Sequence, residues 1–464
     1  MKIIVAGTGF VGLTHAAVLS ESGHQVYAYD IDTTKIAAYN SGDRAQIERY
    51  VNEPGLASII SETLNRYLFF IDQTGIESVI EGTDAIFLCL PTPPNLDGST
   101  DLSYYAEAVH YLAELLANRK DQRRVALVNK STVPIGTARF LQGILNEHNV
   151  PNFGVASNPE FLPEGDAVEK SRKPDRIVIG ADTPEDFEIL RNAYSQYVNH
   201  VRISYLETTP ETAEAIKYVA NTLLLTYISY WNGVGARLGE TFEGIVMEDL
   251  KRGVTGDERI STWGSYVSNG AGGSCFGKDI QSLIYQLRRQ NQPYQLLQNV
   301  FDINEYQKTY LVERAVNEAG FNFNNKTVAL LGLAFKKRTN DMRDASSLKV
   351  VEALLGRGVK KIQAYDPLAV DEAKQFFDPG KNSLFSRISY CEYVEDAIRN
   401  SDALFITTDW EEFRGVAGTI EKTVKPPYLV IDGRRMIANY KYLVNKGYTY
   451  LAVGSQAMIP AAKK

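Results

Sequence analysis

The chain has 464 residues, 44% of them hydrophobic and 23% charged, a composition typical of a globular protein with two or three domains. Its net charge of −7, with lysines and arginines scattered rather than clustered, argues against nucleic acid as a partner. Three widely spaced cysteines and no signal-peptide pattern predict free thiols in a reducing compartment, the cytoplasm.

The first 30 residues have the pattern of a dinucleotide-binding unit. An apolar strand is predicted over 2–6, the turn GTGFVG follows at 7–12, and a helical pattern leads to a second strand over 25–29. Gly7 permits the tight turn, Gly9 lets the backbone approach a pyrophosphate, and Gly12 lets the helix pack on the strand. We expect the pyrophosphate at the helix N-terminus.

Asp30, which ends the second strand, indicates which dinucleotide binds. Its carboxylate can accept hydrogen bonds from both ribose hydroxyls and would repel a 2′-phosphate, so NAD is favoured over NADP. Lys35 is near enough to touch the adenosine, although it could equally be a solvated surface lysine.

Further strands, predicted over 85–90, 125–129 and 153–157, end in loops rich in small and polar residues. Ligands of open α/β sheets bind beyond the carboxyl ends of strands, where these loops lie. The last loop, NPEFLPEG, carries Glu160 and Glu164. This pair could position water or a sugar hydroxyl, or could be the solvated start of a helix.

Residues 209–307 are mostly helical in pattern, and Thr209-Pro210-Glu211 is a good helix start. Lys217 and Asn221, four residues apart, share one helix face among apolar residues; the alternative is a lysine that reaches from an amphipathic edge to solvent. The apolar stretch 218–236 contains polar residues and predicts a buried helix rather than a membrane span. This region could join two domains and carry a dimer interface.

Cys275 follows a glycine cluster at 270–273, where the backbone can approach a ligand closely. A helix that begins beside Cys275 would favour its thiolate, and Asp279 would follow one turn later. The alternative is an inert cysteine buried in a loop. The five histidines have no metal-ligand spacing, so we expect no metal.

A second nucleotide-like unit begins near Lys326. Strands are predicted over 327–335, 362–365, 403–407 and 428–431, with a helix over 347–357. The unit lacks a complete GxGxxG, but basic residues at its strand ends could bind phosphates; these are Lys336, Arg434 and Arg435. The sequence therefore predicts an α/β protein with two Rossmann-like doubly wound domains joined by a central helical region. The expected domains are 1–207, 208–318 and 319–464.

Seven ordered motifs resemble the UDP-glucose/GDP-mannose dehydrogenase family over the whole length: GTGFVGL at 7–13, PTP at 91–93, KSTVPIGT at 130–137, NPEFLPEG at 158–165, KPDRIVIG at 173–180, GGSCFGKD at 272–279 and FKKRTNDMR at 335–343. The resemblance implies oxidation of a sugar nucleotide at C6 to a carboxylate, with two NAD reduced. It favours UDP-glucose over GDP-mannose or a UDP-N-acetylhexosamine, and implies a homodimer or higher homo-oligomer without a membrane segment.

Site residues follow from the same resemblance. The implied catalytic residues are Thr132, Glu160, Glu164, Lys217, Asn221, Cys275 and Asp279. Those implied at the cofactor are Gly7, Gly9, Phe10, Val11, Gly12, Asp30, Lys35, Thr92, Thr132, Glu164 and Arg343. Those implied at the substrate are Glu160, Phe161, Leu162, Glu164, Lys217, Asn221, Arg259 (from a neighbouring subunit), Tyr266, Gly270, Gly272, Phe335, Lys336 and Arg435. Arg434 is the alternative to Arg435, and Gly277 stands where relatives often have proline.

Two rival interpretations are a two-electron β-hydroxyacid dehydrogenase and a non-catalytic protein that senses NAD. The first would share the nucleotide unit and the Lys217–Asn221 pair but would need neither Cys275 nor a second nucleotide unit. The second would have no use for Cys275 and Asp279.

Overall fold

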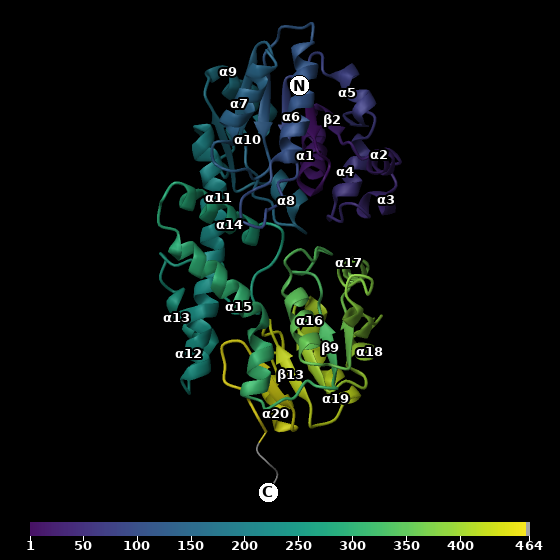
Figure 1. Cartoon of the computed structure of the whole chain (residues 1–464), viewed down its shortest axis with the longest axis vertical. Coiled ribbons are helices and arrows are strands. Elements are labelled where there is room, and N and C mark those ends of the chain that lie inside the picture. The colour runs from purple at the N-terminus through teal and green to yellow at the C-terminus, as the bar shows by residue number, and fades with distance from the viewer. Residues whose placement is uncertain (461–464) are drawn as a thin grey trace. The chain divides into compact units, whose positions relative to one another are not determined.

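The computed structural model describes residues 1–460. Two compact units make up the chain (Figure 1). The N-terminal unit comprises Met1–Ala220 and Tyr285–Gln290, and the C-terminal unit comprises the remainder.

An eight-stranded sheet forms the middle of the N-terminal unit. Its strands are β1 (Lys2–Ala6), β2 (Gln25–Tyr29), β3 (Leu68–Ile71), β4 (Ala85–Leu88), β5 (Val125–Asn129), β6 (Phe153–Ser157), β7 (Arg176–Ala181) and β8 (Ser204–Thr208). The order is β3-β2-β1-β4-β5-β6-β7-β8. Every pair is parallel except β6 and β7, which are antiparallel.

Helices cover both faces of this sheet because its strands are apolar on both sides. Ile3 and Val5 of β1 pack into one core and Ile4 and Ala6 into the other. The first core takes side chains from α1 (Phe10–Glu21), α2 (Thr33–Asn40), α3 (Arg44–Glu48), α4 (Leu56–Thr63), α8 (Ala167–Arg172), α9 (Pro184–Ala193) and α10 (Ser195–Val198). The second takes them from α5 (Gln73–Val79), α6 (Ser103–Ala117) and α7 (Thr137–Glu147).

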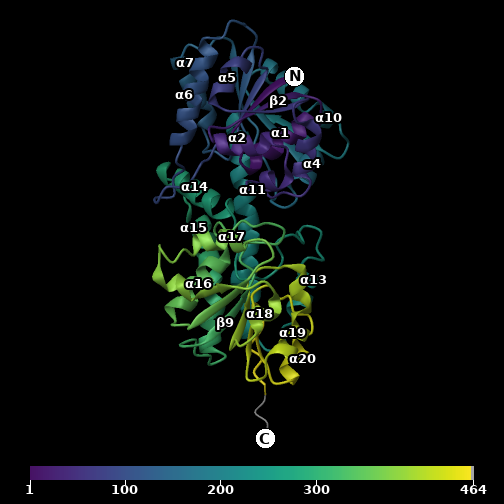
Figure 2. The same ribbon diagram turned by 90° about the vertical axis from the view of Figure 1, so that its right-hand side faces the viewer.

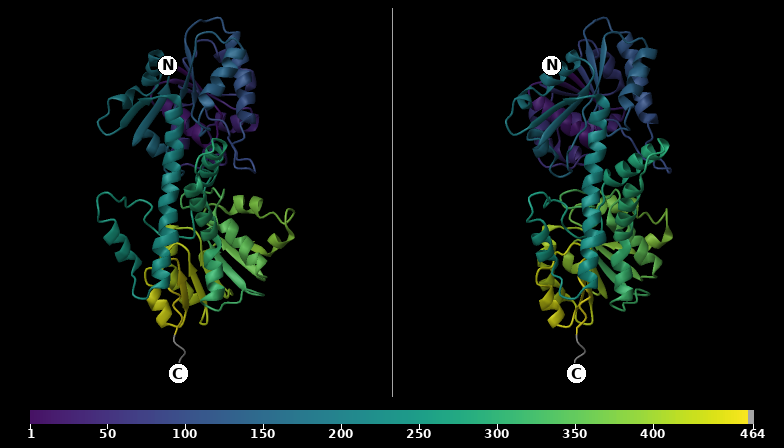
Figure 3. Two further views of the ribbon diagram at one scale, coloured as in Figure 1. Left: turned by 60° about the vertical axis from the view of Figure 1, so that its left-hand side comes forward. Right: turned by 90° about the vertical axis from the view of Figure 1, so that its left-hand side faces the viewer.

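The central region is helical, as predicted. It contains α11 (Pro210–Tyr230), a π-helix (Trp231–Gly235), α12 (Ala236–Thr241), α13 (Met247–Val254), α14 (Phe276–Arg289) and α15 (Gln295–Asn317). Figure 3 displays α11 as the long teal helix. The expectation of a wholly buried helix over 218–236 is wrong for one face, because the apolar side chains of Leu223, Tyr230 and Val234 are 59%, 61% and 42% exposed.

The C-terminal unit contains a second sheet, entirely parallel, in the order β11-β10-β9-β12-β13-β14. Its strands are β9 (Thr327–Leu331), β10 (Lys361–Tyr365), β11 (Ile388–Tyr390), β12 (Ala403–Ile406), β13 (Leu429–Asp432) and β14 (Thr449–Ala452). Numbered from its own first strand, this order is 3-2-1-4-5-6, the dinucleotide-fold order that β1 to β6 also follow. The predicted pair of Rossmann-like units is therefore confirmed.

Two helical layers sandwich this second sheet (Figure 2). One core receives side chains from α15, α16 (Ser346–Gly356) and α17 (Val370–Phe376). The other receives them from α18 (Val394–Ile398), α19 (Val416–Thr423) and α20 (Tyr440–Asn445).

Strand ends differ most from the sequence expectation. The strand expected over 327–335 stops at Leu331 because Gly332 has φ +95° and turns the chain. A Cβ on Gly332 would lie 2.4 Å from the Cβ of Thr408. The strand expected over 85–90 likewise ends at Leu88.

Candidate active site

The glycine turn after β1 has the geometry of a phosphate-binding loop. Gly7 has φ +94°, and a Cβ there would lie 2.4 Å from the carbonyl oxygen of Cys89. A Cβ on Gly12 would lie 1.8 Å from the Gly7 oxygen, so only glycine permits α1 to pack this closely. Gly9 has open space where its Cβ would be, directly before Phe10 and Val11 open α1. The N-terminal amides of α1 thus border room for an anionic group.

Asp30 lies at the end of β2, 9% exposed. Its Oδ2 accepts hydrogen bonds from the Thr8 amide at 2.8 Å and the Thr8 hydroxyl at 2.7 Å. Lys35 Nζ is 3.0 Å from the same oxygen, so this lysine pairs with Asp30 rather than being merely solvated. Burial would raise the pKa of Asp30, but these hydrogen bonds and one from the Asp32 amide hold the pKa below its ordinary value.

Two loops at the carboxyl ends of β4 and β5 are tied together. The Thr92 hydroxyl donates to the Thr132 carbonyl at 3.0 Å, and the Ser131 hydroxyl donates to the Leu90 carbonyl at 2.6 Å. Thr132 also borders a small cavity, together with Ser131, Pro159 and Lys217. The structure therefore brings two of the predicted catalytic residues, Thr132 and Lys217, to one hollow.

Lys217 is buried, not solvent-directed. Its side chain is 6% exposed, and Nζ lies 3.6 Å from Glu160 Oε1 and 5.2 Å from the centre of the Phe161 ring. Glu160, whose side chain is 8% exposed, accepts a 2.6 Å hydrogen bond from the Leu162 amide through its other oxygen. The interpretation of Glu160 as a solvated helix start is wrong, and Glu164 lies half-buried in the same loop.

Two buried carboxylates that the sequence analysis missed hold these loops. Glu214, one turn before Lys217 on α11, accepts hydrogen bonds from the Gly136 and Ala138 amides at 2.7 and 2.9 Å. Glu53 accepts from the Gly165 and Ala167 amides at 2.7 and 2.6 Å, directly after Glu164. Burial raises the pKa of Glu53 and of Glu214 above the ordinary value. Neither residue lies in a recognisable motif. Their roles depend on backbone amides that are far away in sequence, so no local pattern reveals them.

Lys130, the first residue of the KSTVPIGT motif, is also buried. Its Nζ donates to Asn158 Oδ1 at 3.0 Å, beneath the NPEFLPEG loop. Burial lowers the pKa of Lys130 to about 8, although the nearby Glu160 carboxylate partly opposes the shift.

Cys275 immediately precedes α14, and its side chain is exposed. The carbonyl of Cys275 accepts the first helical hydrogen bond from the Asp279 amide, 2.8 Å away. Asp279 is fully buried, 2.6 Å from Asn221 Nδ2 and 2.8 Å from Lys278 Nζ. The predicted helix start beside Cys275 is confirmed, Asn221 and Asp279 lie in contact, and the alternative of a cysteine buried in a loop is wrong.

Glycines before Cys275 are required by close packing. Gly273 has φ +94°, and a Cβ there would lie 2.9 Å from the Phe335 ring. A Cβ on Gly272 would lie 2.4 Å from the Asp344 carbonyl oxygen. Gly270 has φ +89° beside Lys308. The Lys336 ammonium lies 5.7 Å from the centre of the Phe335 ring.

The adjacent arginines point to different partners. Arg434 donates to the carbonyls of Thr407 at 2.7 Å and Phe335 at 3.2 Å, at the carboxyl ends of two strands. Arg435 instead donates to Glu248 and to the carbonyl of Val453. The substrate role predicted for Arg435 stays a prediction, and the geometry places Arg434 beside Phe335.

Three other predicted residues are exposed. The Arg259 side chain is 84% exposed and paired with Asp257. Arg343 pairs with Asp341 at 2.7 Å, and Tyr266 is 43% exposed.

The chain matches three family models in succession. They describe the NAD-binding domain (residues 1–198), the central domain (211–306) and the UDP-binding domain (329–439) of the UDP-glucose/GDP-mannose dehydrogenase family. No helix within residues 1–460 is both long and apolar enough to cross a membrane.

Relatives match along almost their entire length. A UDP-glucose 6-dehydrogenase of Bacillus subtilis is 34% identical over 99% of both chains, and one of Pseudomonas aeruginosa is 34% identical over 98% of this chain and 97% of its own. Among solved structures, a UDP-glucose dehydrogenase of Pyrobaculum islandicum has a TM-score of 0.86 at 30% identity, covering 98% of each chain. A UDP-D-ManNAc dehydrogenase of Pyrococcus horikoshii has a TM-score of 0.80 at 25% identity, covering 98% and 99%. The chain therefore belongs to the UDP-glucose/GDP-mannose dehydrogenase family, whose members are sugar-nucleotide dehydrogenases.

Proposed function

We propose that the protein oxidises UDP-glucose at C6 to UDP-glucuronate with NAD, through covalent intermediates on Cys275. The observation that carries the proposal is an exposed thiol at the start of α14, one turn before a buried aspartate that Asn221 contacts. A helix N-terminus stabilises a thiolate, the nucleophilic form of cysteine. The names of the full-length relatives support the choice of sugar nucleotide.

The residues around the glycine turn fit NAD. The pyrophosphate would lie at the amides of α1 beside Gly9, and Asp30 would accept the ribose hydroxyls. Lys35, already paired with Asp30, would border the adenosine. Thr92 and Arg343 stay predicted contacts of the cofactor. NAD, when bound, accepts one hydride in each of two oxidations, so two NAD are reduced per sugar.

The protein groups would then act as follows. After the C6 alcohol has become an aldehyde, the Cys275 thiolate adds to its carbon and forms a thiohemiacetal. The hydroxyl of this adduct then loses its proton and its carbon loses a hydride, which leaves a thioester. Water attacks the thioester, the C–S bond breaks, and the water oxygen remains in the carboxylate while the thiolate is regenerated. The sugar nucleotide thus stays covalently attached to Cys275 from the aldehyde stage until the thioester is hydrolysed.

Other polar side chains would stabilise charge, accept protons and position water. Lys217 and Asn221 would stabilise the alkoxide and the tetrahedral oxyanions, because a cation and an amide donor both lower the energy of developing negative charge. Asp279 would accept the proton of the C6 hydroxyl through water. Thr132 and Glu164 would orient the hydrolytic water, and Glu160 would fix the Lys217 ammonium that it contacts.

GDP-mannose and UDP-N-acetylhexosamines are the alternative substrates, since the family description includes GDP-mannose dehydrogenases and a structural neighbour is named as a UDP-D-ManNAc dehydrogenase. The test is NADH formation with UDP-glucose, GDP-mannose and UDP-N-acetylmannosamine in parallel. We expect kcat/KM for UDP-glucose to exceed the others by about a hundred-fold or more. A preference for either other sugar nucleotide would overturn the substrate proposal, and no turnover with any of them would favour a binding protein.

We also propose a homodimer that uses one apolar helix face. Leu223, Tyr230, Val234, Leu238 and Phe242 are all exposed and recur every four to seven residues from α11 to the residue after α12. Such a stripe is typical of a helix that packs against a partner. Analytical ultracentrifugation should give a dimer for the natural chain and a monomer for Leu223→Glu combined with Leu238→Glu. A monomeric natural chain would refute this proposal.

A further inference from the structure

The loop that leads to Cys275, residues 268–275, is held by side chains of α15 and the π-helix. Ser268 begins it: its amide donates to Asn232 Oδ1 at 2.8 Å, and its carbonyl accepts from Gln307 Nε2 at 2.6 Å. Asn232 and Gln307 are both completely buried. The next residue, Asn269, donates to Ser346 Oγ through its side chain at 2.8 Å.

Asn304, one turn before Gln307 on α15, makes two hydrogen bonds to the backbone of the loop. Its Oδ1 accepts from the Ala271 amide at 2.8 Å, and its Nδ2 donates to the Ala271 carbonyl at 3.0 Å. One side chain thus satisfies both backbone groups of one residue, as a neighbouring strand would. Asn304 is 2% exposed, so water cannot readily replace it. The carbonyl oxygen of Asn304 also lies 3.2 Å from where a Cβ of Gly270 would be.

The loop reaches α14 with little remaining freedom. The Gly273 amide donates to the Arg343 carbonyl at 2.9 Å, and the Phe335 ring occupies the space that a Cβ of Gly273 would need. Two residues later, Cys275 accepts the first hydrogen bond of α14. The thiol therefore projects from a backbone that is fixed at Ser268, Ala271 and Gly273.

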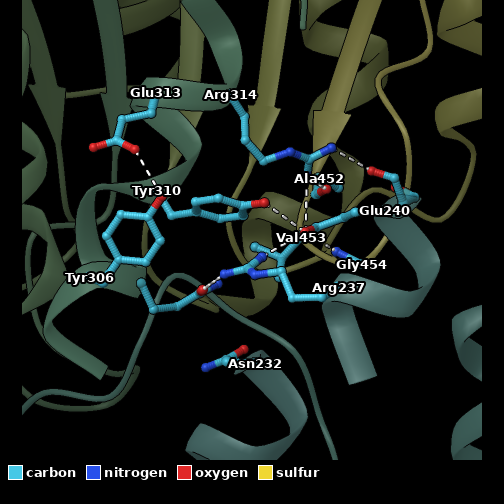
Figure 4. A network of polar contacts seen from close by, with 12 residues as sticks. Asn232, Arg237, Glu240, Tyr306, Tyr310, Glu313, Arg314, Ala452, Val453 and Gly454 are labelled. Carbon is cyan, nitrogen blue, oxygen red and sulfur yellow. Dashed lines mark hydrogen bonds and ion pairs between the residues drawn. The ribbon is translucent and has the colours of Figure 1, made fainter. Parts of the chain in front are cut away.

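A polar network behind α15 supports this anchor (Figure 4). Arg237 of α12 donates to Gln307 Oε1 at 2.6 Å and to Glu240 at 2.6 Å. Glu240 also accepts from Tyr310 and from the amide of Gly454, and it pairs with the buried Arg314 at 3.0 Å. This network fixes α15 against α12 and against the segment after β14, so Asn304 and Gln307 project from a rigid support.

We infer that Asn304 is a positioning residue for the nucleophile: by pairing with both backbone groups of Ala271, it holds residues 268–275 so that the Cys275 thiol lies at the N-terminus of α14. The inference rests on the proposed role of Cys275 as nucleophile. It assigns no contact with substrate or cofactor to Asn304. Sequence motifs give no sign of this role, since Asn304 lies in the middle of a helix, 29 positions after the cysteine.

The test measures the alkylation rate of each cysteine by iodoacetamide at neutral pH, followed by peptide mass spectrometry, without substrate or NAD. Asn304→Ala is the variant and Asn304→Ser the milder one, should the first not fold. Ser229→Ala is the control, because the Ser229 hydroxyl donates to the Val300 carbonyl of the same helix at 3.1 Å, a bond that lies outside residues 268–275. Cys89 and Cys391 report on general unfolding, since burial raises the pKa of both thiols.

We expect alkylation of Cys275 to slow by about three-fold or more in Asn304→Ala, because the thiolate loses its alignment with the helix amides. Ser229→Ala should leave that rate unchanged, and Cys89 and Cys391 should be unaffected in both variants. In turnover, kcat should fall while KM for NAD stays the same. An unchanged Cys275 rate, or equal acceleration at all three cysteines, would overturn the inference. The rate needs no turnover, so failure of the proposed activity would be seen separately, as absent NADH formation by the natural chain.

Discussion

The hydrogen bond between Asn221 and Asp279 permits a quantitative test of how the candidate site is held together. Asn221→Ala removes the amide that lies 2.6 Å from Asp279 Oδ2, and both side chains are buried. A hydrogen bond to a buried charged group contributes about 1.5–3 kcal/mol to stability. For a unit of this size each kcal/mol lowers Tm by about 2–4 °C. We therefore expect Tm of the C-terminal unit to fall by about 3–12 °C.

Differential scanning calorimetry measures this loss, and Thr226→Ala is the matched control. Thr226 lies on the same helix and donates only to the Thr222 carbonyl one turn earlier, so its removal should cost less than about 0.5 kcal/mol. In turnover, Asn221→Ala should lower kcat about a hundred-fold, the usual loss when one oxyanion donor is removed. A Tm equal to that of the control would refute the reasoning.

The isosteric change Asn221→Asp sharpens the test because it would set two carboxylates against each other. Two like charges about 4 Å apart repel by about 4 kcal/mol at an effective protein dielectric constant of about 20. Taking up one proton relieves the repulsion, and the folded state then binds more protons than the unfolded state. The deficit in Tm relative to the natural chain should therefore be small near pH 4 and grow as pH rises toward 7. A deficit that does not change with pH would contradict this account.

Three further changes test the nucleotide unit. Gly12→Ala should abolish NAD binding in isothermal titration calorimetry, because the new Cβ would lie 1.8 Å from the Gly7 oxygen; micromolar binding would contradict the assigned packing. Asp30→Ser should raise KM for NAD by about ten-fold and reduce the preference over NADP, because the ribose acceptor is lost; an unchanged ratio of the two cofactors would contradict that role. Burial lowers the pKa of Lys130 from its ordinary 10.5 to about 8, so the unfolded chain binds the proton more tightly than the folded chain. The stability that Lys130 contributes is therefore complete above pH 10.5 and is lost as the pH falls through 8. Between pH 8 and 10, Tm should therefore rise less with pH in Lys130→Met than in the natural chain. A difference in Tm between the two proteins that stays constant over this range would refute the assigned pKa.

Local patterns predicted the parts of the fold that local physics determines. The glycine turn, α1 and the acid at the end of β2 lie within 30 residues, so their spacing alone identifies a dinucleotide unit. The helix start at Cys275 follows from its glycine cluster in the same way. The second nucleotide unit was visible from alternating apolar strands and helices, although the extra turn at Gly332 shortened its first strand.

Residues that act over long sequence distances were not predictable. Glu53 reaches Gly165 across 112 positions, and Glu214 reaches Gly136 across 78; no local pattern marks a buried carboxylate that accepts backbone amides. The difference between Arg434 and Arg435 depends on φ of +51° at Arg435, which sends adjacent side chains to different partners. The φ angle of Arg435 cannot be predicted from the sequence of this segment.

Covalent capture by Cys275 would keep the aldehyde on the enzyme and permit the second oxidation. The most direct measurement is the number of NADH formed per UDP-glucose consumed, with the natural chain and with Cys275→Ala in the presence of an aldehyde-trapping hydrazine. We expect two NADH per sugar for the natural chain, and at most one for the variant, with the aldehyde recovered as its hydrazone. Two NADH per sugar from Cys275→Ala would contradict the covalent route.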